Sequence, residues 1–399
     1  MNDAFKGRHT VALFSSMVFV LAISLPFATQ VLKLEPQRKA AEKQSQPLPE
    51  FAPEWKTLRL MGHTLADGWL DKNFAFRGEL IRWYNYTSAK IFGSLSTNSP
   101  VLVGKEGWLF LAKDRNRDVM EEHRAVKPYT EGQLAKLAAL YEERRDWLAK
   151  RGISYRVAVA PNKDTVYPEF LPDAFQQVGR QSRLDQIFEY LRAHSTVEFL
   201  DLRQPLLEAK KGQQVFFSTD SHWNVLGAFP CYQAIIASLS KAFPAVRPMR
   251  FSDFTLESYS FLGGDLSYLL GMEDLITEDK LYLMPKRPLR GRGISTGYFA
   301  PGYIQPAQGS TVDDPALPKA VFFHDSYFWE ILPFIGEHFS RAVYVWVKPG
   351  SAEAPQIFDK ELIEAEKPQI VIEEIAERFF IPIPEAQGPE ASSHTIGAQ

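Results

Sequence analysis

The sequence predicts an α/β fold built on a mostly parallel β-sheet. Short runs of β-branched and aromatic residues alternate with longer segments of helical period, which is the order that gives parallel strands joined by helices. The composition is that of a globular protein, with 45% hydrophobic and 23% charged residues in a chain of 399. The formal net charge of −3 and a pI of about 6.3 argue against a general nucleic-acid binder. The single cysteine, Cys231, excludes an intramolecular disulfide and a Cys-rich zinc site.

The N-terminus has the pattern of a signal sequence that is retained as a membrane anchor. Residues 11–28 carry no charge and follow Lys6 and Arg8, and such a run is just long enough to cross a bilayer. It contains no clear small-residue cleavage site. We therefore expect residues 1–34 to form an anchor in the inner membrane, with the rest of the chain in the periplasm.

Two proline-containing segments bound the part of the chain that is expected to fold. Residues 35–53 are polar and predict a linker, and residues 382–399 are rich in Pro, Ser and Gly and predict a disordered tail. Residues 54–381 lie between them and are expected to form the α/β domain. Within this domain, residues 286–318 are rich in Gly, Pro and Arg and are expected to be long loops.

The first elements of the domain have clear local signals. Residues 101–103 and 108–111 flank the turn sequence at 105–107 and predict a β-hairpin. Thr130 and Gln133 have the spacing of a capping box, which predicts that a helix starts there. Its apolar face is formed by Leu134, Leu137, Tyr141 and Leu148.

The later elements continue the alternation. Gly152 ends the first helix, and residues 155–160 predict a buried strand. Further strands are expected at residues 198–202, 215–217, 320–323, 342–347 and 370–375. Further helices are expected at residues 183–193, from about 224, and at 327–339.

A histidine and an acid lie where a ligand site is expected, because ligands bind at the carboxyl ends of parallel strands. In an extended segment Asp220 and His222 point to the same side, since they are two residues apart. A carboxylate beside an imidazole fixes its tautomer and stabilises its charged form. The alternative interpretation is a helix start capped by Asn224 with a structural histidine beside it.

A serine lies at a second predicted junction between a strand and a helix. Ser326 follows the strand predicted at 320–323 and precedes the expected helix, so its hydroxyl is exposed near the helix N-terminus. A serine is a weak nucleophile without a base, which His222 is able to supply. The alternative interpretation is that Ser326 or Asp325 is simply an N-cap.

Two other segments were weighed as site candidates. Asn162 follows the strand at 155–160, and its amide could donate to an oxyanion, although a loop or cap role is the favoured interpretation of this residue. The segment 264–267 contains Gly, Asp and Ser, but no hydrophobic strand leads into it. Ser326 is therefore the preferred nucleophile.

Several segments together resemble the alginate O-acetyltransferase group, the AlgJ/AlgX-like proteins. The resemblance runs in order over about residues 100–380, and the Asp-x-His-Trp and Gly-Trp-Leu-Phe pieces are fairly specific in combination. The segments that carry it are Val103–Phe110, Ala160–Lys163, Val166–Glu169, Thr219–Trp223 and Asp325–Tyr327.

The resemblance implies an SGNH-hydrolase-like, three-layer fold and a triad in the order Asp220, His222, Ser326. It implies a periplasmic enzyme that transfers acetyl groups to a secreted polysaccharide through an acyl-enzyme. It also implies a multi-span membrane O-acyltransferase of the MBOAT type as the acyl-donor partner. We expect no metal and no other cofactor.

The sequence departs from the family pattern in two places. His324 stands where the pattern usually has Gly, and its side chain would either crowd the oxyanion hole or contribute to it. The segment after residue 382 is too short for a carbohydrate-binding module, so glycan contacts are expected on the catalytic face. Trp223, Tyr327 and Trp329 are candidates for stacking on sugar, although core packing is the likelier role for at least two of them.

Three alternative functions remain open at this point. A carbohydrate acetylesterase would use the same triad with water as the acceptor. A metallohydrolase would use Asp220, His222, His324 and Asp325, which suit zinc or manganese. A non-catalytic scaffold of a polysaccharide-export complex would need none of these groups to react.

Overall fold

The computed structural model describes residues 16, 17, 20, 77–96, 98–115, 117–349 and 356–380. The chain divides into two compact units, residues 1–87 and 88–399, and the first contains the helix α4 (Arg77–Thr87). Apart from residues 16, 17 and 20, the anchor expected at 11–28 lies outside the described residues, as do the linker and the tail. Among the helices in the described part of the chain, none has the length and apolar character needed to cross a membrane.

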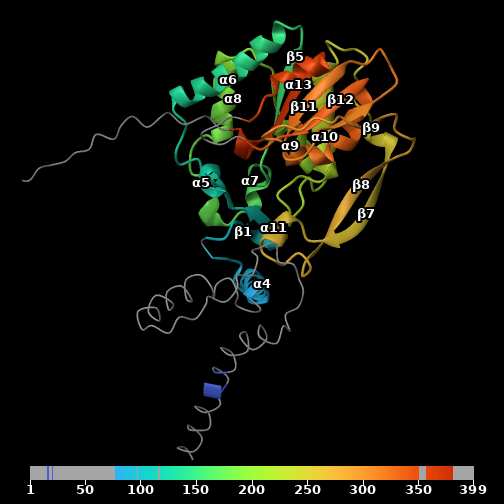
Figure 1. Cartoon of the computed structure of the whole chain (residues 1–399). Coiled ribbons are helices and arrows are strands. Elements are labelled where there is room, and N and C mark those ends of the chain that lie inside the picture. The colour runs from blue at the N-terminus through green and yellow to red at the C-terminus, as the bar shows by residue number, and fades with distance from the viewer. Residues whose placement is uncertain are drawn as a thin grey trace, which may run out of the picture. The chain divides into compact units, whose positions relative to one another are not determined.

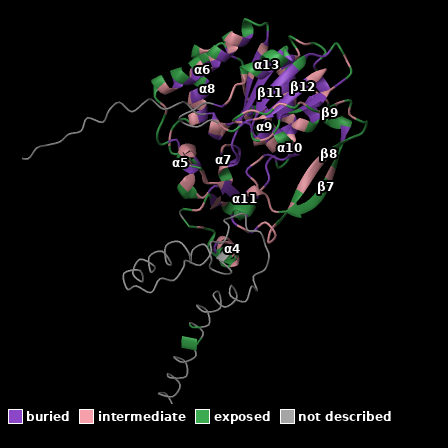
Figure 2. Cartoon of the chain, viewed as in Figure 1, coloured by how far each residue is buried: buried purple, intermediate pink, exposed green. Residues whose placement is uncertain are grey.

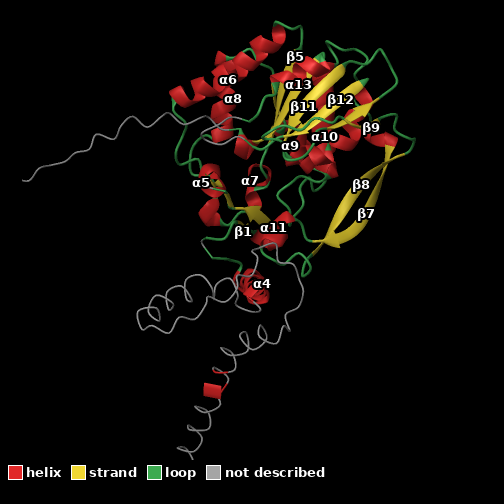
Figure 3. Cartoon of the chain, in the orientation of Figure 1, coloured by secondary structure: helices red, strands yellow, loops and turns green. Residues whose placement is uncertain are grey.

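A seven-stranded sheet forms the centre of the second unit (Figures 1 and 3). Its order is β6-β5-β13-β11-β12-β10-β9, and the strands from β6 to β12 run parallel to their neighbours while β10 and β9 are antiparallel. This confirms the mostly parallel sheet. The strands are β5 (Ser154–Ala160), β6 (Phe199–Asp201), β9 (Arg292–Ser295), β10 (Gln308–Thr311), β11 (Lys319–His324), β12 (Arg341–Trp346) and β13 (Ile370–Ala376).

Helices cover both faces of the sheet and complete the three layers. One face packs against α6 (Glu131–Ala149), α8 (Arg183–His194) and α13 (Lys360–Glu366), and the other against α9 (Arg203–Lys210), α10 (Val225–Leu239) and α12 (Leu332–Ile335). Alternate residues of β11 pack into the hydrophobic cores on the two faces of the sheet. Val321 and Phe323 lie on the first face, and Ala320 and Phe322 on the second. Figure 2 shows the central strands β11 and β12 as buried, as expected for parallel strands covered on both faces.

The α6 helix begins as predicted. The Gln133 backbone N–H donates to Thr130 Oγ1 at 3.2 Å, and the Thr130 N–H donates to Gln133 Oε1 at 2.9 Å, which completes the capping box. Gly152 has a φ of 69°, which favours glycine, and reverses the chain before β5. The capping residues therefore set where this helix begins and where the first central strand follows it.

Smaller elements gather near the carboxyl ends of the parallel strands. They include three antiparallel pairs of strands, one of which is the hairpin predicted at 101–111. The elements are β1 (Val101–Val103), β2 (Leu109–Leu111), β3 (Lys113–Asp114), β4 (Arg117–Asp118), α5 (Val119–His123), α7 (Lys163–Val166), β7 (Phe254–Leu262), α11 (Asp265–Leu269) and β8 (Thr277–Pro285).

Three local expectations were wrong. The strand expected at 215–217 is only an isolated bridge between Phe216 and Trp223, and its apolar residues are explained by burial instead of pairing. The helix expected at 327–339 is broken into the short α12 between two 3₁₀ turns, because Pro333 at its start has no N–H to continue a longer helix. Residues 286–318, expected as loops, contain β9 and β10.

The two missed strands lack the hydrophobic alternation of a half-buried strand. β9 lies at the edge of the sheet and is mostly exposed, so its residues need not be apolar. In β10 a side chain at Gly309 would place its Cβ 2.9 Å from the carbonyl oxygen of Ala342 on β12, so the close approach of the strands excludes one.

Candidate active site

Ser326 lies directly after β11, where the strand turns into the 3₁₀ turn Ser326–Glu330. Asp325 is the N-cap of this turn: its Oδ1 accepts the Tyr327 N–H at 2.9 Å, and its Oδ2 accepts the Ala376 N–H at 2.7 Å on the neighbouring strand β13. Because the aspartate satisfies the cap, the Ser326 hydroxyl is left for another partner. The alternative of a simple cap therefore applies to Asp325 and not to Ser326.

Core packing holds this turn against the sheet. Phe322 of β11 is fully buried, and its ring centroid lies 5.4 Å from that of Phe328, which belongs to the same turn as Ser326. Phe339 and Tyr344 lie at 5.4 and 5.5 Å from the same ring. Removing a buried phenylalanine ring of this kind lowers the free energy of unfolding by about 3–5 kcal/mol. The packing of these rings therefore holds the turn that carries Ser326 in place.

Asp220, His222 and Ser326 form one continuous hydrogen-bonded chain. His222 Nδ1 lies 2.7 Å from Asp220 Oδ1, and His222 Nε2 lies 2.8 Å from Ser326 Oγ. Asp220 Oδ1 also accepts the His222 backbone N–H at 2.9 Å. The structure therefore brings together the three residues that the sequence had placed at two separate strand ends.

The charges in this chain stabilise one another. Burial disfavours the imidazolium form of His222, but the hydrogen bond and charge of Asp220, with a further contribution from Asp265, outweigh burial and raise the pKa of His222. Burial likewise disfavours the carboxylate of Asp220, but His222 and two backbone N–H groups outweigh it and lower the pKa of Asp220. This arrangement favours proton uptake by His222 and an ionised Asp220.

Asp265, set aside in the sequence together with the segment 264–267, belongs to this site. It accepts hydrogen bonds from the Ser221 N–H at 2.6 Å and from Ser221 Oγ at 2.5 Å. Its own N–H donates to Asp220 Oδ2 at 3.0 Å, and its Oδ2 lies 3.5 Å from His222 Nδ1. No local sequence pattern predicts this contact, because α11 contacts the segment of His222 only in the folded protein.

Lys163 is a second residue that sequence reasoning missed. Its ammonium donates to three backbone carbonyls, those of Leu109 at 2.6 Å, Ser218 at 2.8 Å and Asp220 at 3.1 Å. The side chain is buried beside the rings of Trp108 and Phe110, and burial lowers the pKa of Lys163 to about 7. Lys163 thus joins β2 to the segment that carries Asp220.

Glu278 of β8 fixes the same segment from the other side. Its carboxylate accepts hydrogen bonds from the backbone N–H and the hydroxyl of both Ser218 and Thr219, including Ser218 Oγ at 2.7 Å and the Thr219 N–H at 3.1 Å. These contacts place the end of the β7–β8 hairpin that is connected through α11 directly beside the Asp220–His222 segment.

Tyr327 and Trp223 lie on the buried side of the hydrogen-bonded residues Asp220, His222 and Ser326. Tyr327 is 1% exposed; its hydroxyl donates to the Ser221 carbonyl at 2.9 Å, and its ring centroid lies 5.0 Å from that of His222. Trp223 is fully buried and donates from Nε1 to the Tyr327 carbonyl at 2.9 Å. The expectation that at least two of the three aromatic candidates are core residues is confirmed, while Trp329 is 36% exposed.

His324 is turned into the core. Its Nδ1 donates to the Asp325 carbonyl at 2.8 Å, its ring stacks on Phe328 with centroids 4.7 Å apart, and burial lowers its pKa to about 4. The four residues named for a metallohydrolase are therefore not assembled as a ligand set, because His324 Nδ1 and both carboxylate oxygens of Asp325 bond to backbone groups instead. In the described part of the chain, Asp220, His222 and Asp265 are the residues whose ligand atoms lie within 4.8 Å of one another.

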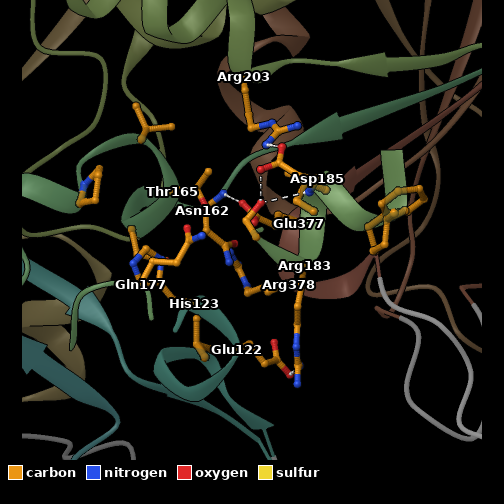
Figure 4. Close-up of a pocket in the computed structure, with 18 of the residues that line it drawn as sticks. Glu122, His123, Asn162, Thr165, Gln177, Arg183, Asp185, Arg203, Glu377 and Arg378 are labelled. Carbon is orange, nitrogen blue, oxygen red and sulfur yellow. Dashed lines mark hydrogen bonds and ion pairs between the residues drawn. The ribbon is translucent and has the colours of Figure 1, made fainter. Parts of the chain in front are cut away.

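Asn162 lies in a polar cleft of about 230 Å³ (Figure 4). Its backbone N–H donates to Glu377 Oε2 at 2.8 Å, and its side-chain oxygen is buried with no hydrogen-bond partner. The cleft also contains an ion pair between His123 and Asp164 at 2.9 Å. Burial and the nearby charge of Asp164 raise the pKa of Glu377 to about 7.

The cleft and the Ser326 site share one residue. Arg378 lines the cleft, and its guanidinium donates to the Tyr327 hydroxyl at 3.3 Å. Asn162 lines the cleft as well, and the hydrogen bond of its backbone N–H runs to Glu377 and not to Ser326.

Known proteins resemble this chain in sequence and in fold. The family model described as "SGNH hydrolase-like domain, acetyltransferase AlgX" matches residues 101–377. A protein of Pseudomonas syringae pv. tomato named "Probable alginate O-acetylase AlgJ" is 30% identical over 187 residues, which are 47% of this chain and 44% of that protein. A Pseudomonas aeruginosa protein of the same name is 25% identical over 290 residues, 70% of each chain.

The fold is also found among solved structures. The structure of Bacillus cereus PatB1 superposes with a TM-score of 0.50 and 14% identity, over 70% of this chain and 97% of that one. The match to the Pseudomonas syringae protein spans less than half of that relative's length. The comparisons therefore support the fold over most of the described domain, and the family through residues 101–377.

Proposed function

Because this chain belongs to the family of SGNH hydrolase-like acetyltransferase AlgX domains, we propose that it is an O-acetyltransferase whose acceptor is a hydroxyl of a secreted polysaccharide. The observation that carries the proposal is the hydrogen-bonded chain from Asp220 through His222 to Ser326, with contacts of 2.7 and 2.8 Å. A nucleophile, a base and a group that orients the base are the three parts that acyl transfer requires.

The first step forms an acetyl-enzyme. Ser326 Oγ attacks the carbonyl carbon of the acetyl donor while His222 Nε2 takes its proton. The tetrahedral adduct collapses, the bond to the donor's leaving group breaks, and His222 returns the proton to that group. The charge of Asp220 stabilises the imidazolium throughout.

The second step passes the acetyl group to the acceptor. A sugar hydroxyl attacks the acetyl-serine ester and gives its proton to His222, and Ser326 leaves with that proton. The side chain of His222 keeps 23% of its surface accessible, so an acceptor reaches it from solvent. Water competes as acceptor unless the bound glycan displaces it.

The oxyanion of both steps needs hydrogen-bond donors beside Ser326. The Tyr327 N–H is taken by Asp325, and the Tyr327 hydroxyl and His324 Nδ1 each bond to a backbone carbonyl in the core. We assign the Ser326 N–H, at the start of its 3₁₀ turn, as one donor. The Asn162 amide stays a prediction as a second.

The setting of the reaction follows from the resemblance and from the N-terminal sequence. We propose residues 54–381 as the catalytic domain, held in the periplasm by an anchor at residues 1–34. A membrane-bound O-acyltransferase of the MBOAT type would deliver the acetyl groups from the other side of the membrane.

The test is turnover of a chromogenic acetyl ester by the purified protein. Ser326→Ala and His222→Ala should each lower kcat/KM at least about a hundredfold, while Ser260→Ala, an exposed serine on β7, should leave it unchanged. Wild-type rates in the Ser326→Ala variant would overturn the mechanism and favour a scaffold. Products formed with and without an oligosaccharide acceptor separate a transferase from an acetylesterase.

A further inference from the structure

One face of the β7–β8 hairpin presents exposed aromatic rings. In the antiparallel register Tyr259 is paired with Lys280, and Phe261 with Glu278, so these four side chains share a face. Tyr282 lies on the same face, with its ring centroid 5.8 Å from that of Tyr259 and 6.2 Å from that of Phe261. Tyr259, Phe261 and Tyr282 are named the aromatic platform.

Packing among the described residues does not explain the aromatic platform. Tyr259 is 52% exposed and Phe261 is 47% exposed, and Figure 2 shows β7 as the exposed strand of the hairpin. The other face of the hairpin contributes to the core through Phe254 and Leu283. Contiguous exposed rings on a folded domain mark a binding surface.

The same hairpin face is tied to the candidate active site. Glu278 binds the backbone and hydroxyls of Ser218 and Thr219, next to Asp220. Lys280 forms an ion pair at 3.1 Å with Glu330, which ends the 3₁₀ turn that begins at Ser326. The hairpin that carries the aromatic platform is therefore tied, through Glu278 and Lys280, to both chain segments of the candidate active site.

We propose that the aromatic platform binds sugar rings of the acceptor glycan, and that the rings it binds are uncharged. This inference rests on the proposed acetyltransferase function and names the class of its acceptor. The C–H faces of a pyranose ring are apolar and pack on aromatic rings, while its hydroxyls stay in water or reach the Tyr259 hydroxyl.

The charges on this face argue for a neutral glycan. Of the residues of β7 and β8 that share the face of the aromatic platform, Lys280 is the one cation, and Glu330 already pairs with it. Glu257 and Glu278 add two acidic groups to the same face. The carboxylates of a polyuronate would find no unpaired cation there and would be repelled, whereas a neutral chain pays no such penalty.

The test combines binding and turnover in the full-length protein. The probes are cellohexaose and mannohexaose as neutral chains and hexamannuronate as the charged one, with a chromogenic acetyl ester as donor. Tyr259→Ala/Phe261→Ala should raise the Kd for a neutral hexaose, and its KM as acceptor, about tenfold, with ester hydrolysis in the absence of acceptor unchanged. Wild type should bind a neutral hexaose at least tenfold more tightly than hexamannuronate.

A matched control comes from the opposite face of the same strand. Leu256→Ala/Leu262→Ala removes side chains that are 48% and 60% exposed, and it should change neither Kd nor KM. Three results would each overturn the proposal. Hexamannuronate could bind more tightly than the neutral chains, or both double variants could lose equal affinity for the neutral hexaose. The third is a dimer that only the Tyr259/Phe261 change dissociates. Failure of binding by all three probes would overturn it as well.

Failure of the proposed function gives a different result. Ser326→Ala should bind the neutral hexaose with the wild-type Kd and transfer no acetyl group. If wild type binds the hexaose through the aromatic platform but neither cleaves the ester nor transfers acetyl, the acetyltransferase function fails and glycan binding stands. If transfer depends on Ser326 but not on Tyr259 and Phe261, the aromatic platform fails alone.

Discussion

Gly264 lies against Asp220 so closely that a Cβ at position 264 would stand 2.4 Å from the Asp220 Cβ. Real side chains do not approach to this distance, so the aspartate that orients His222 packs on bare backbone. The contact also brings the Asp265 N–H within 3.0 Å of Asp220 Oδ2. A glycine in a segment without any strand signal is thus part of the geometry of the site.

Gly264→Ala should displace Asp220 and uncouple it from His222. We expect kcat/KM for an acetyl ester to fall at least about tenfold, because the imidazole loses the group that fixes its tautomer. Gly293→Ala, where nothing lies within 4 Å of the added Cβ, is the matched control. Wild-type activity in Gly264→Ala would show that Asp220 is not needed in its observed position.

Asp265→Asn should move the pH dependence of the reaction to lower pH. The Asp265 carboxylate helps to raise the pKa of His222 against the effect of burial, so removing its charge lowers that pKa. His222 acts as a base only in its neutral form. When its pKa falls, the acid limb of the kcat/KM profile therefore moves to lower pH. Asp279→Asn, at an exposed acid on β8, should leave the profile in place; an upward shift in Asp265→Asn contradicts the assignment.

Lys163→Met should destabilise the fold, because three buried carbonyls lose their shared donor. We expect the free energy of unfolding to fall by about 3 kcal/mol in urea denaturation near pH 7. Burial holds the pKa of Lys163 at about 7, below its unfolded value, so the unfolded chain binds more protons above pH 7. The loss should therefore grow as the pH rises above 7, and a loss that shrinks would contradict it. Lys241→Met, at an exposed lysine, is the control.

His324→Gly restores the residue that the family pattern usually has, and it tests whether the histidine takes part in the reaction. The ring is buried against Phe328, so its removal leaves a cavity that costs about 2–4 kcal/mol of stability. Ester kcat measured well below the melting temperature should stay within about twofold of wild type. A tenfold change in kcat with an unchanged Tm would instead place His324 in the oxyanion hole.

Local signals in the sequence account for the sheet and for the core of the site. The capping box of Thr130 and the continuous apolar run of residues 320–323 are short-range patterns, and both predictions are confirmed. Asp220 and His222 share a face because they are two residues apart in an extended segment. Ser326 follows the end of a strand, and the carboxyl edge of a parallel sheet brings the two segments together.

The supporting residues have no such signal. Lys163, Asp265 and Glu278 each act on backbone groups of the segment 218–221, and these contacts exist only after α7, α11 and β8 have packed around it. The strands β9 and β10 are missed for a related reason, because an exposed edge strand and a closely packed small-residue strand carry no hydrophobic period.

The two reacting side chains are each followed by a residue that ties the pair together: the indole of Trp223 donates to the carbonyl of Tyr327 inside the core. Separating His222 from Ser326 by local fluctuation would require breaking this buried bond, which ordinary loop motion does not do. We expect both segments to open only in the highest-energy, cooperative unfolding event. The indole hydrogen of Trp223 should then be among the slowest hydrogens to exchange, and loss of activity on heating should coincide with global melting.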